Sequence, residues 1–325
     1  MSHDPLPHIP PVFPLSPPSE AEALEDYHAL RALDMAEVWR EGEWSSRSDV
    51  PGPHIPLLLG MSRAGAKASN RYHFAARMAC ESNVSPSPVR SWYCLQHRAS
   101  LEGSQYYEAS PAKALNLRKY VASPYRPAAA LAQIRAFGAR RVYDPCGGWG
   151  DRLLAALAAD IEVYYARDVN PNVFIGYSEQ VRAYPSSTRV CVEYKQAEVD
   201  APAENYFDLV MTSPPYWKTE KYAGDLSSHA LYRSFHDWLK GFCFPMMRHA
   251  ATALAPGGHA LFTVSDVYAN HTLNRICLPM VETAPEYGLM YVGALGYGLG
   301  KRINHRNEQS KAAGFGEPVL VFRKE

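Results

Sequence analysis

Beyond residue 140, the chain alternates between short apolar runs and segments with helical spacing. The apolar runs predict strands at residues 141–143, 162–167, 191–194, 207–211, 260–264 and 318–323. The segments between them predict helices at 151–159, 171–184 and 246–254, and one through the apolar positions from Leu231 to Phe242. Strands that alternate with helices form largely parallel sheets with helices on both faces. This part of the chain therefore predicts a doubly wound α/β fold.

Before residue 140 the periodicity is weaker. Residues 1–18 contain seven prolines and predict a flexible tail. Ser19 and Glu22 form a capping pattern ahead of a helix predicted near residues 20–40, and further helices are predicted at 72–79, 111–121 and 127–137. A chain of 325 residues is long for one domain. We therefore expect an accessory, mostly helical region at 19–120, with a role in target recognition, followed by a domain at 121–325.

The charges are unevenly distributed, although the formal net charge is zero. Residues 1–50 carry ten acids and three arginines, whereas residues 51–130 carry ten basic residues and three acids, with aromatic residues between them. A basic, aromatic-rich stretch suits a polyanion such as nucleic acid, and Lys67, Arg71 and Arg77 are candidate phosphate contacts. A solvated basic face over buried aromatic rings explains the same pattern equally well.

Cysteine and histidine spacing indicates neither a disulfide framework nor a metal site. The six cysteines lie far apart, and the histidines lack the spacing of ligand pairs. The N-terminus has no basic patch followed by an apolar run, and no later run is long enough to span a membrane. We expect a cytoplasmic protein without a bound metal, and the oligomeric state stays open.

The first chemical motif is the turn Asp144-Pro-Cys-Gly-Gly-Trp-Gly150, which follows a predicted strand and precedes a predicted helix. Glycine lets the backbone pass close to a ligand, and the acid Asp168 at the end of the next strand suits a ribose. Leu153 stands where a dinucleotide-binding turn has its third glycine. The motif therefore favours S-adenosylmethionine over a nicotinamide cofactor. An ordinary tight turn is the alternative.

The second motif is Ser213-Pro214-Pro215-Tyr216, which follows an apolar strand and precedes Trp217. Two prolines fix the backbone and leave carbonyl groups free to accept hydrogen bonds, so the turn suits an amino group on a planar ring. Ser213 and the Pro214 carbonyl accept its protons in this interpretation, and Tyr216 stacks on the ring. Ser16-Pro-Pro-Ser19 repeats the three residues without the strand or the aromatic residue.

Together, the two motifs resemble the amino-methyltransferases of DNA, which methylate N4 of cytosine or N6 of adenine. Leu254-Ala-Pro-Gly-Gly258, Leu320-Val-Phe-Arg-Lys324 and Ser123-Pro-Tyr-Arg126 match other segments of that family, and the similarity covers about 200 residues. The resemblance implies a doubly wound, Rossmann-like methyltransferase sheet, mostly parallel, with an antiparallel terminal strand.

The resemblance also implies a role for each motif residue. Asp144, Pro145, Cys146, Gly148 and Gly150 would hold the methionine end of S-adenosylmethionine, and Asp168 its ribose. Ser213, Pro214, Pro215 and Tyr216 would be catalytic, with Trp217 at the substrate. A serine at the head of the second motif slightly favours cytosine N4, because the adenine enzymes more often carry Asp or Asn there.

Several alternatives stay open. An RNA base, a protein amide or a small amine presents a similar conjugated nitrogen, and an inactive cofactor-binding scaffold is a further alternative. Pro145-Cys146 is also typical of C5-cytosine methyltransferases, but the pair lies in the cofactor turn instead of beside a base. The chain has no long insertion between the motifs for target recognition, so residues 1–125, 217–229 or 301–306 would have to supply it.

Overall fold

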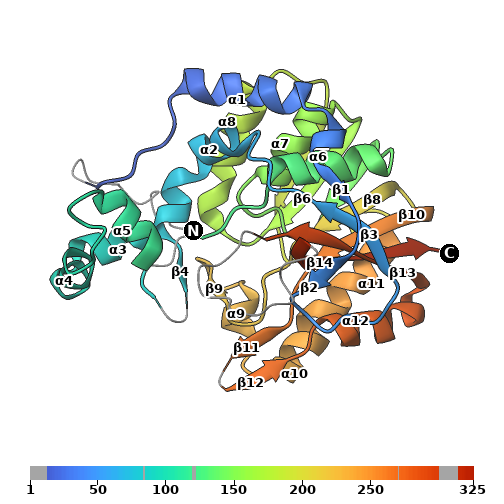
Figure 1. Cartoon of the computed structure of the whole chain (residues 1–325). Coiled ribbons are helices and arrows are strands. Elements are labelled where there is room, and N and C mark those ends of the chain that lie inside the picture. The colour runs from blue at the N-terminus through green and yellow to red at the C-terminus, as the bar shows by residue number, and fades with distance from the viewer. Residues whose placement is uncertain (1–12, 83–84, 119–121, 270, 300–313) are drawn as a thin grey trace.

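The structure is a computed structural model that describes residues 13–82, 85–118, 122–269, 271–299 and 314–325. A ten-stranded sheet forms its centre, with β2 paired to β14 beside the main strand order β1-β3-β13-β14-β10-β8-β5-β6-β7 (Figure 1). The predicted tail at 1–18 lies largely outside the described residues. So do residues 119–121 of the helix predicted at 111–121, and the segment 301–306.

The predicted alternation of strands and helices is present. Its strands are β5 (Arg141–Asp144), β6 (Val163–Asp168), β7 (Arg189–Tyr194), β8 (Phe207–Thr212) and β10 (Leu254–Thr263). The helices on one face include α6 (Pro127–Ala136), α7 (Asp151–Ala159) and α8 (Phe174–Ala183). The five strands pair in parallel, in the order β10-β8-β5-β6-β7. This arrangement confirms the doubly wound fold.

Alternate side chains of each strand enter two separate apolar cores. Val142 of β5 and Leu261 of β10 contribute to the core beneath α6, α7 and α8. Their neighbours Tyr143 and Phe262 enter the core on the opposite face. That second core contains Trp238 and residues of two further helices, α11 (Phe244–Ala253) and α12 (Cys277–Thr283). Helices therefore cover both faces of the sheet, as Figure 1 shows.

The last strand, β14 (Gly314–Lys324), is antiparallel to β10 on one side and to β13 (Leu289–Gly298) on the other. The antiparallel terminal strand is therefore confirmed, while β13 was not predicted. Its sequence contains three glycines, which weaken a strand pattern. The glycines serve close packing: a Cβ on Gly296 would lie 2.5 Å from Leu58 and 2.7 Å from Trp44.

The N-terminal region contributes strands as well as helices. Helix α1 (Glu20–Ala32) has the predicted Ser19–Glu22 capping box but ends eight residues before residue 40. Leu33 is extended, a short 3-10 turn at Met35–Glu37 follows, and β1 (Trp39–Glu41) occupies the rest of the predicted helix. Strands β2 (Trp44–Ser46) and β3 (His54–Leu59) then join the central sheet. The prediction of a mostly helical region missed these three strands.

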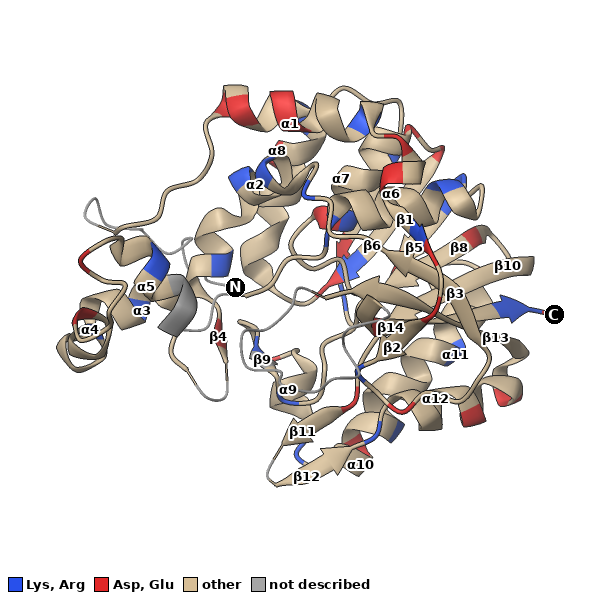
Figure 2. Ribbon diagram, in the orientation of Figure 1, with Lys and Arg blue, Asp and Glu red and all other residues tan. Residues whose placement is uncertain are grey.

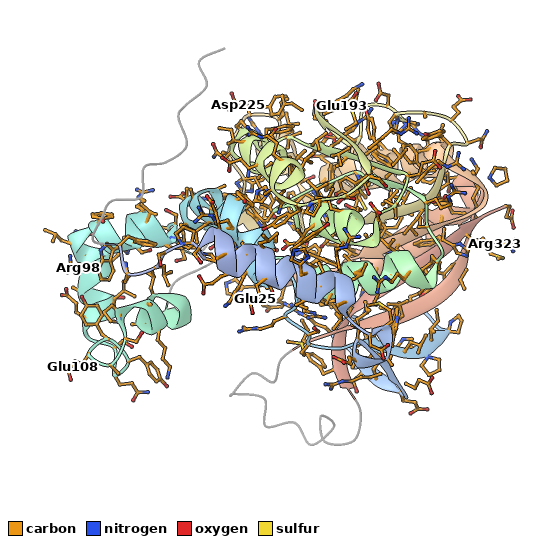
Figure 3. All side chains as sticks on the ribbon, turned by 90° about the horizontal axis from the view of Figure 1, so that it is seen from above. Glu25, Arg98, Glu108, Glu193, Asp225 and Arg323 are labelled. Atoms are coloured by element: carbon orange, nitrogen blue, oxygen red, sulfur yellow. The ribbon has the colours of Figure 1, made fainter. Side chains whose placement is uncertain are left out.

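Four more helices follow in the N-terminal region. Helix α2 (Ala66–Ala79) is longer than the predicted 72–79 and packs against α1 and α8. Helices α3 (Pro88–Tyr93), α4 (Leu95–Glu102) and α5 (Pro111–Arg118) form a lobe around Trp92, Leu101 and Leu115. The lobe, with Arg98 and Glu108, lies at one end of the molecule and Arg323 at the other (Figure 3).

Short elements connect this lobe to the second motif. Strand β4 (Glu81–Ser82) pairs with β9 (Glu220–Lys221), four residues after Tyr216. The predicted helix from Leu231 to Phe242 is divided into α9 (Ser228–Leu231), α10 (Phe235–Trp238) and a π-helix at Leu239–Cys243. A hairpin of β11 (Val267–Ala269) and β12 (Thr272–Asn274) completes the fold. No helix in the described residues is long and apolar enough to cross a membrane.

Candidate functional site

Three turns at the carboxyl ends of adjacent parallel strands meet around one cavity. The turn after β5 contributes Pro145, Cys146 and Gly148, the turn after β6 contributes Asp168, and the turn after β8 contributes Ser213 and Pro215. The cavity contains about 600 Å³ of open space. Open α/β sheets bind ligands at this edge, where the strand order reverses. The fold therefore brings together two motifs that lie more than sixty residues apart in sequence.

Asp144 lies beneath the cavity and does not line it. Its carboxylate is fully buried, accepts a hydrogen bond from Arg152 Nε at 2.7 Å and another from the Tyr164 hydroxyl at 2.7 Å. Arg152 also donates to the carbonyl of Cys146. A buried, paired carboxylate of this kind fixes the turn. Asp144 therefore has a structural role in the turn, and its predicted contact with the methionine end of a cofactor stays a prediction.

Gly148 and Gly150 both have positive φ, but they face different neighbours. Gly148, with φ of 63°, lines the cavity, and its N–H donates to Asp168 Oδ2 at 2.7 Å. Gly150, with φ of 73°, is not among the cavity-lining residues; a Cβ there would collide with His73 and Gln180. Glycine at 150 is thus required by packing against α2 and α8, and its predicted contact with a cofactor stays a prediction.

Asp168 is the ionisable group at the rim of the glycine-rich turn. Its two oxygens accept from the backbone N–H groups of Gly148, at 2.7 Å, and Asn170, at 2.8 Å. Burial raises the pKa of Asp168 to about 6, and nearby Asp144 adds to this effect. The carboxylate lines the cavity as a hydrogen-bond acceptor, which is what a ribose requires.

Cys146 lies on the cavity wall, but it is a poor nucleophile there. Burial raises the pKa of its thiol well above the usual value, and the carboxylates of Asp168 and Asp144 raise it further. A nucleophilic cysteine needs the opposite shift, because the thiolate is the reactive form. This environment argues against the C5-cytosine mechanism.

The second motif presents only part of its predicted surface to the cavity. Ser213 and Pro215 line the cavity, whereas Pro214 is buried. The half-buried Tyr216 hydroxyl lies 3.2 Å from the Thr263 carbonyl and 3.4 Å from Ser213 Oγ. Trp217 is 4% exposed. It packs against Phe235 and Trp238 and supports the turn from the core, and its predicted contact with a substrate stays a prediction.

Two further cavity walls come from segments outside the two motifs. Lys195, Ala197 and Glu198 follow β7, and Tyr222 and Leu226–Ser228 follow the second motif. Burial raises the pKa of Glu198, whose Oε1 accepts from the Tyr232 hydroxyl at 3.3 Å. The first of these walls follows the end of the third predicted parallel strand, a position where a ligand-binding residue can be expected from the sequence. The segment after Trp217 has no comparable periodic signal.

The three candidate phosphate contacts lie on α2 and do not line the cavity. Lys67 Nζ lies 3.4 Å from Glu22, and Arg71 Nη2 lies 3.1 Å from Glu20, both carboxylates of α1. Arg77 is buried, and its Nη2 donates to the Ala122 carbonyl at 2.8 Å. In Figure 2, red segments lie on α1 and blue segments on the neighbouring α2. Arg77 therefore has a packing role, and only Lys67 and Arg71 keep exposed surface.

In the described part of the chain, no group of three or more His, Cys, Asp or Glu is placed to hold a metal ion.

No family model and no curated protein matches this chain. Solved structures that resemble it include a TehB-like S-adenosylmethionine-dependent methyltransferase from Corynebacterium glutamicum, at 19% identity over 60% of this chain and 87% of that one, with a TM-score of 0.37. Magnesium protoporphyrin IX methyltransferase from Synechocystis shows 11% identity over 61% and 78% of the two chains, with a TM-score of 0.38. A 1,6-didemethyltoxoflavin N1-methyltransferase from Burkholderia thailandensis shows 15% identity over 60% and 76%, with a TM-score of 0.37.

At these identities and TM-scores the similarities carry no further argument. The fold rests on the sheet itself, in which five parallel strands are followed by an antiparallel strand, β14, between β10 and β13. The protein therefore has a doubly wound, Rossmann-like α/β fold.

Proposed function

We propose that this protein transfers a methyl group from S-adenosylmethionine to an exocyclic amino nitrogen of a nucleic-acid base, with DNA as the substrate and cytosine N4 favoured over adenine N6. One observation carries the proposal: the glycine-rich turn with Asp168 and the Ser213-Pro-Pro turn open onto the same cavity. A donor and an acceptor of a methyl group must meet within one water-excluding site.

The residues present fit S-adenosylmethionine. Asp168 offers a carboxylate to the ribose hydroxyls, and the positive φ of Gly148 keeps the backbone close to the ligand without a side chain between them. Val173, Ala197 and Phe242 give an apolar wall to a planar ring. When bound, the cofactor supplies an electrophilic methyl group on a positively charged sulfur.

The chain's part in the reaction is to hold and orient the amine. An exocyclic amine is a weak nucleophile while its lone pair is conjugated into the ring. Ser213 Oγ and the Pro214 carbonyl, as acceptors, would turn its N–H bonds so that the lone pair points toward the methyl group. The nitrogen would take up the methyl group that S-adenosylmethionine supplies and would release one proton to water. Alignment and desolvation then supply the rate.

The choice of substrate rests on the sequence resemblance and on charge. Residues 51–130 carry the excess of basic and aromatic residues, which suits nucleic acid more than a protein amide or a small amine. A base in a duplex must be extruded at a cost of a few kcal/mol, whereas a single strand avoids that cost. RNA remains the second candidate because it presents the same amino groups.

The decisive experiment is methyl transfer in defined pools. The purified protein is incubated with tritiated S-adenosylmethionine and with single-stranded DNA, duplex DNA, RNA or protein, and labelled nucleosides are identified by mass spectrometry. We expect N4-methylcytosine in DNA. Label in RNA or in protein alone would replace DNA as the substrate, and the absence of label in every pool would refute the proposal.

Variants of the second motif test the chemistry. Ser213→Ala removes one acceptor, and Tyr216→Ala removes a stacking surface worth about 1–3 kcal/mol per base. Both should keep the parental affinity for S-adenosylhomocysteine, measured by calorimetry, and lose most methyl transfer. Ser16→Ala, in the exposed second copy of Ser-Pro-Pro, is the matched control and should change neither. Methyl transfer by Tyr216→Ala at the parental rate would remove the proposed base contact.

A further inference from the structure

A carboxylate from the last strand lies beside the Ser213-Pro-Pro-Tyr216 turn. Because β14 is antiparallel to β10, its first residues lie next to the carboxyl ends of β10 and β8, where the second motif begins. Glu317, in this part of β14, places Oε2 3.4 Å from the Tyr216 hydroxyl, and its side chain is only 13% exposed. Neither sequence motif includes this residue.

The N-terminal region holds Glu317 in position. Arg47 Nη1 lies 3.0 Å from the other carboxylate oxygen, Oε1, and the backbone N–H of Arg47 donates to the Gly316 carbonyl at 2.9 Å. Strand β2, which ends directly before Arg47, pairs in parallel with Gly314–Gly316. One oxygen of Glu317 is therefore fixed by a cation, and the other faces Tyr216.

The Tyr216 hydroxyl has one proton, and its neighbours include three oxygens. The Thr263 carbonyl at 3.2 Å and the Glu317 carboxylate at 3.4 Å can only accept, whereas Ser213 Oγ at 3.4 Å can donate or accept. If Tyr216 gives its proton to an acceptor-only neighbour, Ser213 donates its own proton to the Tyr216 oxygen. Both lone pairs of Ser213 Oγ then stay free to accept a hydrogen bond from the cavity side.

These O···O separations are longer than that of a strong O–H···O hydrogen bond. Geometry alone therefore only weakly determines which oxygen donates and which accepts. An ionised acceptor favours one direction, because bonds to charged groups are stronger than neutral ones. Ser213 carries no charge of its own at the head of the motif. Glu317 therefore provides, from another strand, the negative charge that this turn lacks.

We propose that Glu317 is a positioning residue that acts through the Tyr216 hydroxyl and turns Ser213 into an acceptor for the amino group of the substrate. This inference rests on the proposed function, since it assigns Ser213 an amine as its partner. Arg47 and β2 give the N-terminal region a direct part in the same site.

A double-mutant cycle tests the inference. Glu317→Gln keeps the size of the side chain but adds an amide donor, and Tyr216→Phe keeps the ring but removes the hydroxyl. In the DNA methyl-transfer assay, we expect Glu317→Gln to lower kcat about tenfold, as for loss of a hydrogen bond to a charged group. KM for DNA, affinity for S-adenosylhomocysteine and Tm should stay at parental values. In the Tyr216→Phe background, Glu317→Gln should have no further effect.

The matched control is Asp49→Asn, which removes another carboxylate paired with an arginine, Arg275, at 2.9 Å, away from the cavity walls. It should leave kcat unchanged. If the parental protein labels no substrate pool, the proposed function is wrong and this inference falls with it. If the parent is active, three results overturn the inference alone: full activity of Glu317→Gln, multiplicative losses in the double variant, or a loss of Tm or of S-adenosylhomocysteine affinity in Glu317→Gln.

Discussion

We expect the protonation state of the Asp168 carboxyl to affect the binding of the cofactor. Since burial raises the pKa of Asp168 to about 6, the free protein carries more of the neutral acid as the pH falls below that value. Ribose hydroxyls donate more strongly to a carboxylate than to a neutral acid. We expect the affinity for S-adenosylhomocysteine to fall by up to about tenfold per pH unit below pH 6, measured by calorimetry between about pH 5 and 8. Asp168→Asn should bind weakly and show a flat profile, and equal parental affinity at both ends of the range would contradict this role.

The two glycines of the first motif should respond differently to alanine. At Gly148 an added Cβ finds ordinary contacts, so Gly148→Ala carries only the cost of positive φ, about 1–2 kcal/mol. At Gly150 the same change also displaces His73 and Gln180, so the loss in free energy of unfolding should exceed that of Gly148→Ala by about 1–3 kcal/mol. Urea denaturation compares the two variants, and equal losses would exclude packing as the reason for Gly150.

The sequence identified the chemical residues better than their surroundings. Gly148, Asp168 and Ser213 lie on one cavity as the motifs predicted, because the rule for parallel strand ends requires only local patterns. Asp144 and Trp217 were predicted at the ligand, but both are buried and neither lines the cavity. A sequence motif identifies a residue, whereas the direction of its side chain depends on partners outside the motif. Arg152 is such a partner for Asp144, and Trp238 is one for Trp217.

At the scale of elements, variants of helix α2 can decide between the two interpretations of the basic segment, a phosphate-binding surface or a solvated face. Lys67 keeps 59% of its side chain exposed despite its ion pair with Glu22, and Arg71 keeps 26%. If α2 contacts phosphates, replacing both by alanine should reduce the slope of log affinity against log salt by about 0.9 per contact. Fluorescence anisotropy with DNA at several salt concentrations measures this slope.

Arg77 is the contrast within the same helix. Because it is buried against Ala122, Arg77→Ala should lower the free energy of unfolding by about 2 kcal/mol or more, by leaving a buried carbonyl without its charged donor. An unchanged salt slope in the Lys67/Arg71 double variant would favour a solvated face paired with α1 over a phosphate-binding surface.

Elements with strong periodicity were predicted almost to the residue, as α7 at 151–159 and β8 near 207–211 show. The missed strands share a different property. Strands β1 and β2 have three residues each, and β13 contains glycines, so neither length nor propensity marks them. They form because their partners β3 and β14 are already extended beside them, which no local pattern reveals.

At the scale of the molecule, the N-terminal region and the sheet share one core. Tyr27, Leu30 and Leu59 belong to the same buried cluster as α6 and α7, and β3 covers the edge of β13. We expect residues 121–325 expressed alone to lack a cooperative thermal transition, because these apolar surfaces and a strand edge become exposed. Circular dichroism and calorimetry on the fragment and the full chain provide the comparison. A fragment that unfolds cooperatively would support a separate domain beginning at residue 121.

Strand β2 can pair with β14 only after the ribosome has synthesised both strands. Trp44 lies next to Gly314 in the finished sheet, and 270 residues (314 − 44) separate them along the chain. At about 5–20 residues per second, a ribosome needs roughly 14–54 s to make that stretch. Over this interval β2 lacks its partner strand β14. We expect the nascent chain to expose this strand edge until β14 has been synthesised and has left the exit tunnel.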